Sequence, residues 1–249
     1  MKLHVPELKL AWEDDFSFGA YPSLESWNFQ TGGHGWGNEE LQFYTDRHND
    51  KANAYIRNGR LVIEARKEDY ENRLYTSARL NTKKSWTYGR FTVRAKLPSG
   101  IGTWPAIWMM PDVPRYGDWP NSGEIDIMEH LGRLKNTIYS SIHTEATNHT
   151  LDNHIISSTI VDTATTDFHD YTIDWTPDQI TGYVDGKAYF LAEKPFSDTQ
   201  NGGNAYWPFH HPFHLILNLA VGGTWPGKVD SSWNVQHFEI DYVRVYQYI

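Results

Sequence analysis

Short segments with β-strand character, separated by turn residues, recur along the whole chain. Residues 60–66 are rich in strand-forming residues and follow Asn58-Gly59, a dipeptide typical of tight hairpin turns. Residues 90–96 alternate charged or polar residues with apolar ones, which is the period of a half-buried strand. No stretch of useful length carries the 3.6-residue apolar period of a capped amphipathic helix. These features constrain the chain to an all-β fold.

The second half of the chain continues the same pattern to its end. Residues 171–175 and 179–184 flank a Thr-Pro-Asp turn and predict a hairpin. Residues 213–219 are almost continuously apolar, which indicates a strand covered on both faces, and residues 240–246 alternate strictly. The sequence shows no fixed-period repeat, low-complexity tract or interdomain linker. We therefore predict one domain, residues 1–249, built as a sandwich of two antiparallel sheets.

The net charge and the aromatic content limit the class of binding partner. The chain has 249 residues and a formal net charge of −9 at pH 7. Contacts with nucleic-acid phosphates need clustered Lys and Arg, so we expect no nucleic-acid partner. The 11 Trp, 15 Tyr and 11 Phe residues stand in a chain whose mean hydropathy is −0.61. Many aromatic rings in a polar, acidic chain favour a neutral partner.

Cysteine content and hydropathy exclude further classes of protein. The chain has no cysteine, which excludes a disulfide framework, a thiol nucleophile and a Cys-ligated zinc ion. No window approaches the roughly 18 consecutive apolar residues of a membrane span. Residues 1–16 lack the apolar core of a signal peptide, so we expect either a cytosolic protein or one whose leader has been removed.

The most informative strand lies within residues 119–131. Successive side chains of a strand point to opposite faces, so Glu124 and Asp126 share one face. Ile125 and Ile127 then point into the apolar layer. The strand is therefore expected to present acids on one side and to pack isoleucines on the other.

The third acid of this strand, Glu129, falls on the wrong face if the strand is regular. Strict alternation puts Met128 beside Glu124 and Asp126, and it puts Glu129 in the apolar layer, where an ionised carboxylate is costly to bury. One extra residue, a β-bulge near Met128, returns Glu129 to the side of the other acids. We therefore predict three carboxylates in a row on one sheet face.

Such a row suits the cleavage of a glycosidic bond. This reaction needs one ionised carboxylate and one carboxylic acid that stays protonated near neutral pH. Like charges held close together raise the pKa of one member and so separate the two roles. In isolation, three acids along a strand are also typical of an exposed polar face or of Ca²⁺ ligands. Trp104, Trp108 and Trp119, which lie just upstream, favour the catalytic interpretation.

Several co-linear motifs resemble those of glycoside hydrolase family 16. Residues 123–129, Gly-Glu-Ile-Asp-Ile-Met-Glu, resemble the signature of that family in its bulged form with the additional Met. Residues 35–45 resemble the substrate-cleft segment of bacterial laminarinases. Further motifs follow in the expected order at residues 76–80, 88–91, 97–100, 104–108, 217–227 and 240–246. The resemblance covers nearly the whole chain.

This resemblance implies a fold and a set of roles. It implies a concave β-jelly-roll sandwich of concanavalin-like type with an open cleft, endo action and retention of anomeric configuration. By position, Glu124 is then the nucleophile, Glu129 the general acid/base and Asp126 a support for the nucleophile. The matching sugar-binding positions are Asn38, Arg79, Trp104, Trp108 and Trp119. A Trp ring suits a pyranose, because the C–H face of the sugar is apolar and the ring offers a large contact area.

Two further residues are interpreted together with the cleft. His143 follows on the next strand, and the resemblance implies that it faces the cleft near the acid/base. A solvent-facing strand histidine is the alternative. Trp225 is expected either in the opposite cleft wall or packed under the Gly222-Gly223 turn.

The resemblance also implies a structural Ca²⁺ on the convex side. Its ligands correspond to Asp15, Gly59 and Asp241, and Ca²⁺ accepts carboxylates, backbone carbonyls and waters as ligands. Plain surface acidity is the alternative for Asp14, Asp15 and Asp241. No cofactor is expected for catalysis, because the 12 histidines are scattered and form no HExxH pair.

We expect a hydrolase of β-1,3-glucan of laminarin type, of mixed-linkage β-1,3-1,4-glucan, or of both. A hydrolase of marine galactans such as agar or carrageenan is a second interpretation, although the charge of −9 weighs against a sulfated substrate. Transglycosylation is a third. A non-catalytic carbohydrate-binding module on the same sandwich predicts the loss of a catalytic carboxylate, and all three are present. A polysaccharide substrate indicates a secreted, periplasmic or cell-surface protein, which we expect to be a monomer.

Overall fold

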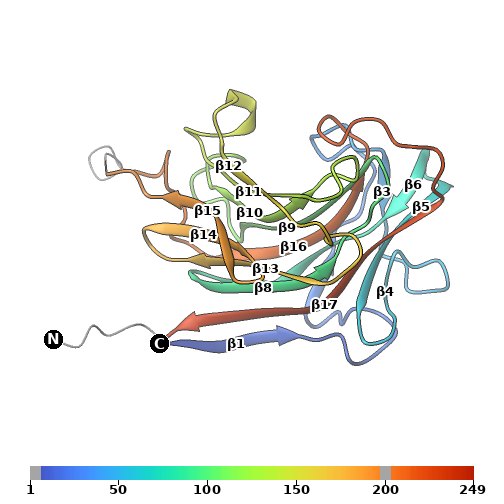
Figure 1. Ribbon diagram of the computed structural model, residues 1–249, viewed down its shortest axis with the longest axis horizontal. Coiled ribbons are helices and arrows are strands. Elements are labelled where there is room, and N and C mark those ends of the chain that lie inside the picture. Colours follow the sequence, from blue (N-terminus) through green and yellow to red (C-terminus); the bar gives the residue numbers. More distant parts are fainter. Residues whose placement is uncertain (1–6, 197–202) are drawn as a thin grey trace.

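The computed structural model describes residues 7–196 and 203–249 of the chain. Two β-sheets lie face to face within these ranges (Figure 1). Apolar side chains fill the space between them. The helical structure described is one short 3₁₀ helix, η1 (His149–Leu151). The predicted all-β sandwich is therefore confirmed.

Strands from both halves of the chain form the ten-stranded sheet. Its order is β15-β14-β13-β8-β17-β5-β6-β3, with β1 beside β17 and β4 beside β5. The strands are β1 (Leu8–Asp14), β3 (Gln42–Tyr44), β4 (Ala54–Ile56), β5 (Leu61–Tyr70), β6 (Arg73–Ser77), β8 (Gly89–Lys96), β13 (His169–Trp175), β14 (Gln179–Val184), β15 (Lys187–Glu193) and β17 (Val235–Tyr248). One pair departs from the predicted antiparallel arrangement, since β3 and β6 run parallel. The chain passes through β4 and β5 between them, and that crossover restores the direction of β3.

The seven-stranded sheet holds the strand with the three acids near its centre. Its order is β12-β11-β10-β9-β16-β7-β2. The strands are β2 (Trp27–Phe29), β7 (Arg79–Trp86), β9 (Thr103–Pro111), β10 (Glu124–His130), β11 (Thr137–His143), β12 (Ile155–Ile160) and β16 (Phe213–Val221). Each of its neighbouring pairs is antiparallel.

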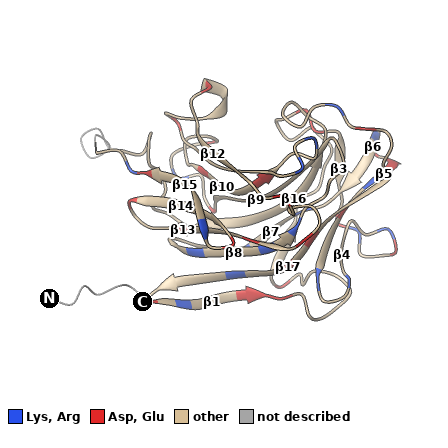
Figure 2. Cartoon of the chain, in the orientation of Figure 1, with Lys and Arg blue, Asp and Glu red and all other residues tan. Residues whose placement is uncertain are grey.

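Strand β8 shows how the alternating sequence builds the sandwich. Its inward side chains, which include Phe91 and Val93, are buried in the core, and its outward side chains are half-buried. The outward Arg90 donates two hydrogen bonds to the carboxylate of Asp174 on the neighbouring β13, at 2.6 and 2.7 Å. Figure 2 shows Lys and Arg residues along β8 and β17. Apolar residues thus face the second sheet, and paired charges face solvent.

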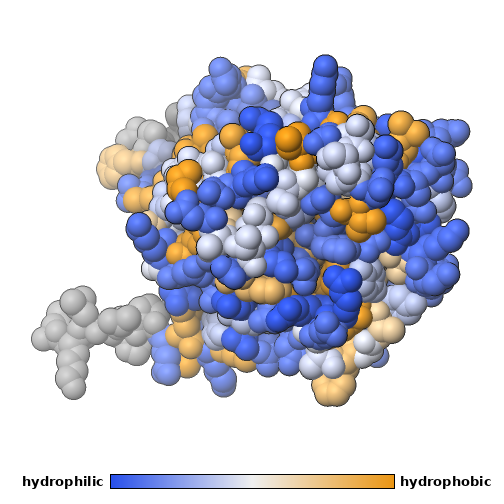
Figure 3. Space-filling view, turned by 45° about the vertical axis from the view of Figure 1, so that its right-hand side comes forward, coloured by the Kyte–Doolittle hydropathy of each residue, from blue (hydrophilic) through white to orange (hydrophobic). Residues whose placement is uncertain are grey.

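Buried apolar side chains from both sheets form one cluster. Strand β16 is buried along almost its whole length, as its apolar sequence predicts. The face of the molecule shown in Figure 3 is mainly hydrophilic with scattered hydrophobic residues. Within the described ranges, no helix has the length and apolar character needed to cross a membrane.

Candidate active site

Strand β10 contains the β-bulge that the sequence predicts. Asp126 lies opposite Trp108 of β9, whereas Glu129 lies opposite Ala106, so β10 carries one extra residue over this interval. The side chain of Met128 packs in the apolar core, which differs from its position on a regular strand. The extra residue turns Met128 inward and turns Glu129 to the face of the other acids.

Glu124 lies at the start of β10, directly after Gly123. Gly123 has a φ of +88°, a backbone conformation that favours glycine. The carboxylate of Glu124 accepts a hydrogen bond of 2.5 Å from the indole N–H of Trp119. Burial, and next the charge of Asp126, raises the pKa of Glu124 to about 8.

Asp126 lies in the middle of the row and is buried. One of its oxygens, Oδ2, accepts a hydrogen bond of 2.5 Å from the hydroxyl of Ser141, on the neighbouring β11. The same oxygen lies 3.3 Å from Nε2 of His143. Burial raises the pKa of Asp126 to about 6, and the bond from Ser141 opposes that rise.

The hydrogen bonds of His143 define its tautomer. Its Nδ1 accepts the backbone N–H of His149 at 3.3 Å. A backbone N–H only donates, so the proton of the neutral imidazole lies on Nε2, which faces Asp126. Burial lowers the pKa of His143, which favours this neutral form. In the strand register His143 lies opposite Glu124, so it stands beside the first two acids and not beside Glu129, where we expected it.

Glu129 ends the row and is largely buried. Its Oε1 accepts a hydrogen bond of 3.0 Å from the indole N–H of Trp104. Burial, followed by the charges of Asp126 and Glu124, raises the pKa of Glu129 well above its usual range. This rise favours the protonated form of Glu129, which can donate its proton to a bound ligand.

The three acids titrate as one coupled group, because each carries a pKa raised by burial and stands beside another acid. Glu124 and Asp126 also share a hydrogen bond. The row as a whole thus retains protons at neutral pH. It combines a carboxylic acid at one end with a partly ionised pair at the other, which is the combination that glycosidic cleavage requires.

A stacked cation lies on one side of the acids. The guanidinium group of Arg79 is sandwiched between the rings of Trp36 and Trp108, at 4.5 and 4.6 Å from their centroids. Its Nε donates a hydrogen bond to the side-chain oxygen of Gln30. The indole N–H of Trp108 donates to Oδ1 of Asn218 at 2.7 Å. The stack therefore holds a flat aromatic surface beside the acids.

A second aromatic group surrounds the other end of the row. The ring of Trp225 lies edge-on to Trp104 and to Tyr139, with centroid distances of 5.6 and 5.2 Å. Trp104 is the residue that donates to Glu129. Trp225 thus belongs to the cleft wall on the Glu129 side, which is the first of its two expected placements.

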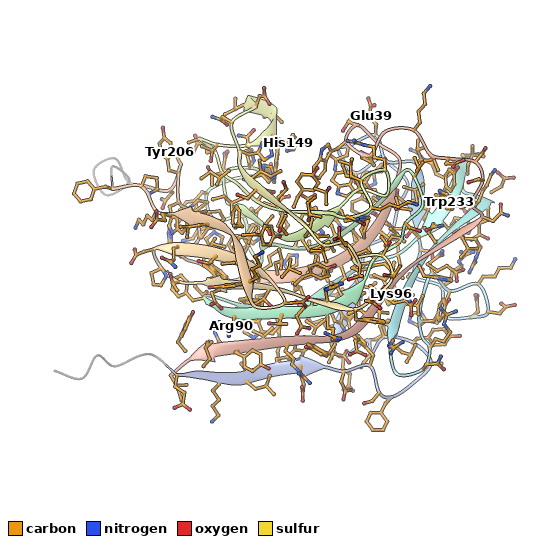
Figure 4. The ribbon with its side chains drawn as sticks, viewed as in Figure 1. Glu39, Arg90, Lys96, His149, Tyr206 and Trp233 are labelled. Atoms are coloured by element: carbon orange, nitrogen blue, oxygen red, sulfur yellow. The ribbon has the colours of Figure 1, made fainter. Side chains whose placement is uncertain are left out.

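The acids and both aromatic groups line one open cleft with a volume of about 780 Å³. Figure 4 shows His149 and Glu39 at the top of the molecule, both above the seven-stranded sheet. All the residues predicted to bind sugar line this cleft: Asn38, Arg79, Trp104, Trp108, Trp119, His143 and Trp225. Residues that lie far apart in the sequence are thus gathered around the carboxylate row.

Comparison with known families identifies the chain. The family described as Glycosyl hydrolases family 16 matches residues 36–244. The chain belongs to this family. It is similar to a β-glucanase of Rhodothermus marinus, with 49% identity over 98% of this chain and 87% of that protein. It is also similar to a glucan endo-1,3-β-glucosidase of Cryptopygus antarcticus, with 39% identity over 94% of this chain and 90% of that protein.

A solved structure supports the same assignment. The laminarinase of Rhodothermus marinus superimposes with a TM-score of 0.92 and 49% identity, over 99% of this chain and 100% of that one. The chain is thus a glycoside hydrolase with the jelly-roll fold of its structural neighbours.

Sequence reasoning missed two histidines of this family 16 cleft. His149 and His154 come from the segment between β11 and β12 and line the cleft. The ring of His149 lies 4.9 Å from that of Trp119, and the ring of His154 stacks on His143 at 5.0 Å. His149 begins the single-turn helix η1 and His154 follows it in a loop, and the sequence there has no strand or helix period that would have predicted their position.

One group of cleft residues has the composition of a metal site. Ligand atoms of Glu124, Asp126 and His143 lie within 4.8 Å of one another. The nitrogen of His143 that faces this group carries the proton of the neutral ring, so its lone pair is not free for a cation. The group is accounted for as the acidic row and its hydrogen-bond donor.

The three expected calcium ligands are brought toward the middle of β17, but the two aspartates have other partners. The strand registers place Asp14 opposite Val243 and Leu61 opposite Ile240, which brings the neighbouring Asp15 and Gly59 toward Asp241. The two oxygens of Asp241 face the Nε atoms of Arg60 and Arg94, at 3.4 and 3.6 Å. Asp15 accepts two hydrogen bonds from Ser17. A calcium ion there would compete with these bonds.

Proposed function

We propose that this family 16 hydrolase is a retaining endo-glucanase that cleaves β-1,3-glucan of laminarin type, mixed-linkage β-1,3-1,4-glucan, or both. The observation that carries the proposal is the row of Glu124, Asp126 and Glu129 on one face of an open cleft. The names of the relatives support a glucan, since they are a β-glucanase, a glucan endo-1,3-β-glucosidase and a laminarinase.

In the first step of the proposed reaction, Glu124 attacks the anomeric carbon of the bound sugar. The glycosidic bond breaks, and Glu129 donates its proton to the departing oxygen. A glycosyl ester forms on Glu124. The raised pKa of Glu129 supports its role as the acid of this step.

In the second step, water attacks the anomeric carbon and the ester bond to Glu124 breaks. Glu129, now ionised, accepts the proton of the water and returns to its starting form. Two inversions at the same carbon give net retention of configuration.

Asp126 supports the nucleophile in both steps. Glu124 must be ionised when it attacks, although burial raises its pKa. Asp126 can take up the shared proton in that state, and it is itself held by Ser141 and His143. A proton that moves between the two acids thus allows Glu124 to react without leaving two buried charges side by side.

An open cleft supports endo action, because a polymer can enter and leave it sideways. Trp108 and Trp225 offer aromatic surface on the two sides of the acids. Sugar rings pack well on such surfaces, since their C–H faces are apolar. A chain of several sugar units can therefore cross the row.

The decisive experiment compares four polysaccharides under one condition. Laminarin, barley mixed-linkage glucan, agarose and κ-carrageenan are each incubated with the enzyme, and reducing ends and product sizes are measured. Short oligosaccharides from laminarin or barley glucan, with the β-anomer released first in NMR spectra, are expected. Release from a galactan alone would move the substrate assignment, and no release from any of the four would favour a binding module.

We further propose a structural Ca²⁺ with Asp15, Gly59 and Asp241 among its ligands. The strand registers that bring these residues together support it. The ion pairs of Asp241 with Arg60 and Arg94 count against it. Binding would require at least one of these arginines to turn away.

We also propose that the enzyme acts outside the cytoplasm, as a monomer. A polymeric substrate cannot cross a membrane, so its hydrolase has to be exported to reach it. Fractionation of the producing cells tests the location, and light scattering of the purified protein tests the oligomeric state.

A further inference from the structure

The cleft wall formed by residues 35–41 has an unusual backbone. Gly35, Trp36, Gly37 and Glu39 have φ values of +83°, +52°, +79° and +58°. Trp36 and Glu39 are not glycines, so their left-handed conformation is strained. Such a backbone persists only where surrounding bonds hold it, and the next residue, Glu40, makes several.

Glu40 is a buried acid that the mechanism above does not use. It lines the cleft, yet its side chain is only 4% exposed. Its Oε1 accepts a hydrogen bond from Nδ2 of Asn38 at 3.3 Å. Its Oε2 accepts from Nε2 of Gln42 at 2.6 Å and from the hydroxyl of Tyr44 at 3.2 Å. Burial raises the pKa of Glu40, whereas its three hydrogen-bond donors and the charge of Arg79 act in the opposite direction and favour the ionised form.

A chain of hydrogen bonds connects Glu40 to the sugar-binding surface. The indole N–H of Trp108 can only donate, and it donates to Oδ1 of Asn218 at 2.7 Å. The amide nitrogen of Asn218 therefore points to the hydroxyl of Tyr44, at 3.0 Å. The Tyr44 hydroxyl accepts this bond and donates a hydrogen bond of its own to Glu40. Every donor in the chain is thus oriented toward Glu40, which accepts the last bond.

Glu40 also balances the buried charge of Arg79. The guanidinium of Arg79 is held between Trp36 and Trp108, and it interacts electrostatically with both Glu40 and Glu124. Glu40 and Glu124 are the two carboxyl groups among these interactions, and the third partner, the phenol of Tyr44, stays neutral because burial raises its pKa well above the usual range. Loss of the charge on Glu40 would leave Arg79 to act on Glu124 alone.

We propose that Glu40 is a positioning residue, which orients Trp108 through Tyr44 and Asn218 and shares Arg79 with the nucleophile. It sets the affinity of the cleft for the sugar unit that packs on Trp108. This role rests on the proposed glucanase function, since it requires a sugar on Trp108.

The substitution Glu40→Gln tests this role with almost no change in shape. The new amide group brings two donors to a site where every neighbour already donates. Gln42 is unable to turn its amide around, because its Oε1 accepts the backbone N–H of Val221 at 2.8 Å. In the variant, the hydrogen bond between Gln42 and position 40 is therefore lost, and an N–H group of each side chain faces the other. We expect KM for laminarin to rise about tenfold, with kcat within about twofold of wild type.

The pH profile of the same variant separates this role from a purely structural one. The positive charge of Arg79, no longer balanced by Glu40, favours the ionised form of Glu124. The acidic limb of kcat/KM is therefore expected to move to lower pH. A loosened loop alone would lower activity without moving this limb.

Two tyrosine substitutions complete the test. Tyr44→Phe breaks the bond chain but keeps the charge of Glu40, so KM should rise while the acidic limb stays in place. Tyr171→Phe is the matched control, because the buried hydroxyl of Tyr171 has no hydrogen-bond partner among the described residues, and it should change neither quantity.

The outcomes distinguish this proposal from the one on which it rests. If wild type releases nothing from either glucan, the proposed function fails. If wild type cleaves laminarin while Glu40→Gln keeps both its KM and its pH profile, the role of Glu40 is overturned. If Glu40→Gln does not fold, Tyr44→Phe decides: a KM equal to that of Tyr171→Phe rejects the proposal, and a raised KM supports it.

Discussion

Nε2 of His143 lies 3.3 Å from Oδ2 of Asp126, and the backbone N–H of His149 determines which nitrogen of that ring carries the proton. The segment between β11 and β12 thus acts on Asp126, the central acid of the row, through the imidazole of His143. His143 serves as a neutral hydrogen-bond donor to Asp126, and burial lowers its pKa, which favours this neutral form.

The substitution His143→Ala should lower kcat/KM for laminarin about tenfold, because Asp126 loses a donor that favours its ionised form. His143→Gln supplies an amide N–H toward Asp126 and should recover part of the loss. Steady-state kinetics of the two variants checks this. Equal activities for Ala and Gln at position 143 would show that the donor is unimportant.

The basic limb of the pH profile should depend on Asp126. Burial, and then the charges of Asp126 and Glu124, raises the pKa of Glu129, so the acid form of Glu129 is present below that pKa and is lost as the pH rises through it. Asp126→Asn removes one of these charges. The basic limb of kcat/KM should then move to lower pH by about one unit. A limb that stays in place in the Asn variant would assign it to another group.

The role of Glu129 as an acid can be separated from simple binding by the choice of leaving group. Glu129→Gln should reduce the hydrolysis of laminarin about 10²–10⁴-fold, because the sugar leaving group needs a proton. Aryl β-laminaribiosides whose leaving group is an acidic phenol need little protonation. The rate of their first step, glycosylation of the enzyme, should therefore fall much less. Burst kinetics on 2,4-dinitrophenyl laminaribioside measures that step. A comparable loss with both leaving groups would exclude the acid role.

Gly123 is expected to tolerate no side chain. A Cβ there would lie 2.9 Å from the ring of Phe209 and 2.9 Å from Pro208, and the φ of +88° adds strain. Gly123→Ala should lower the free energy of unfolding by about 2–4 kcal/mol. Gly186→Ala is the matched control, because Gly186 has a φ of +77° with open space around it, and it should cost only about 1–2 kcal/mol. Urea unfolding measures both, and equal losses would show that the contact with Phe209 is unimportant.

The proposed calcium site predicts a stability that depends on the metal. Free Ca²⁺ at about 100 times its Kd would stabilise the fold by about 2.7 kcal/mol, which corresponds to a rise in Tm of about 5–10 °C over the chelated protein. Asp241→Asn should abolish this dependence. Identical melting curves of the wild-type protein with Ca²⁺ and with EGTA would reject the calcium site, and Asp241 would then serve only as the ion-pair partner of Arg60 and Arg94.

Strand positions were predictable because alternation reports burial directly. The bulge near Met128 was predictable for a related reason, since a regular strand would have buried the charge of Glu129. The cleft loops gave no such signal. His149 and His154 occupy a segment whose conformation depends on contacts with Trp119 and His143, and a local pattern cannot report those contacts.

Long-range polar networks could not be predicted from the sequence, for a different reason. Glu40 stands in a motif that the sequence analysis recognised, but its partner Tyr44 is connected to Asn218, which lies 174 positions further along the chain. The burial of Glu40 follows from the packing of the cleft wall formed by residues 35–41 against the seven-stranded sheet. Spacing along the chain does not determine such a meeting.

The extra residue in β10 also protects the strand against slipping. Before the bulge, one face carries Glu124 and Asp126; after it, the same face carries Glu129, while Met128 stays in the core. A shift of the strand by one position against β9 would expose apolar residues to the cleft and push carboxylates into the interior at the same time. The bulge thus makes a register shifted by one residue unfavourable, and in that register the three acids would no longer share the cleft face.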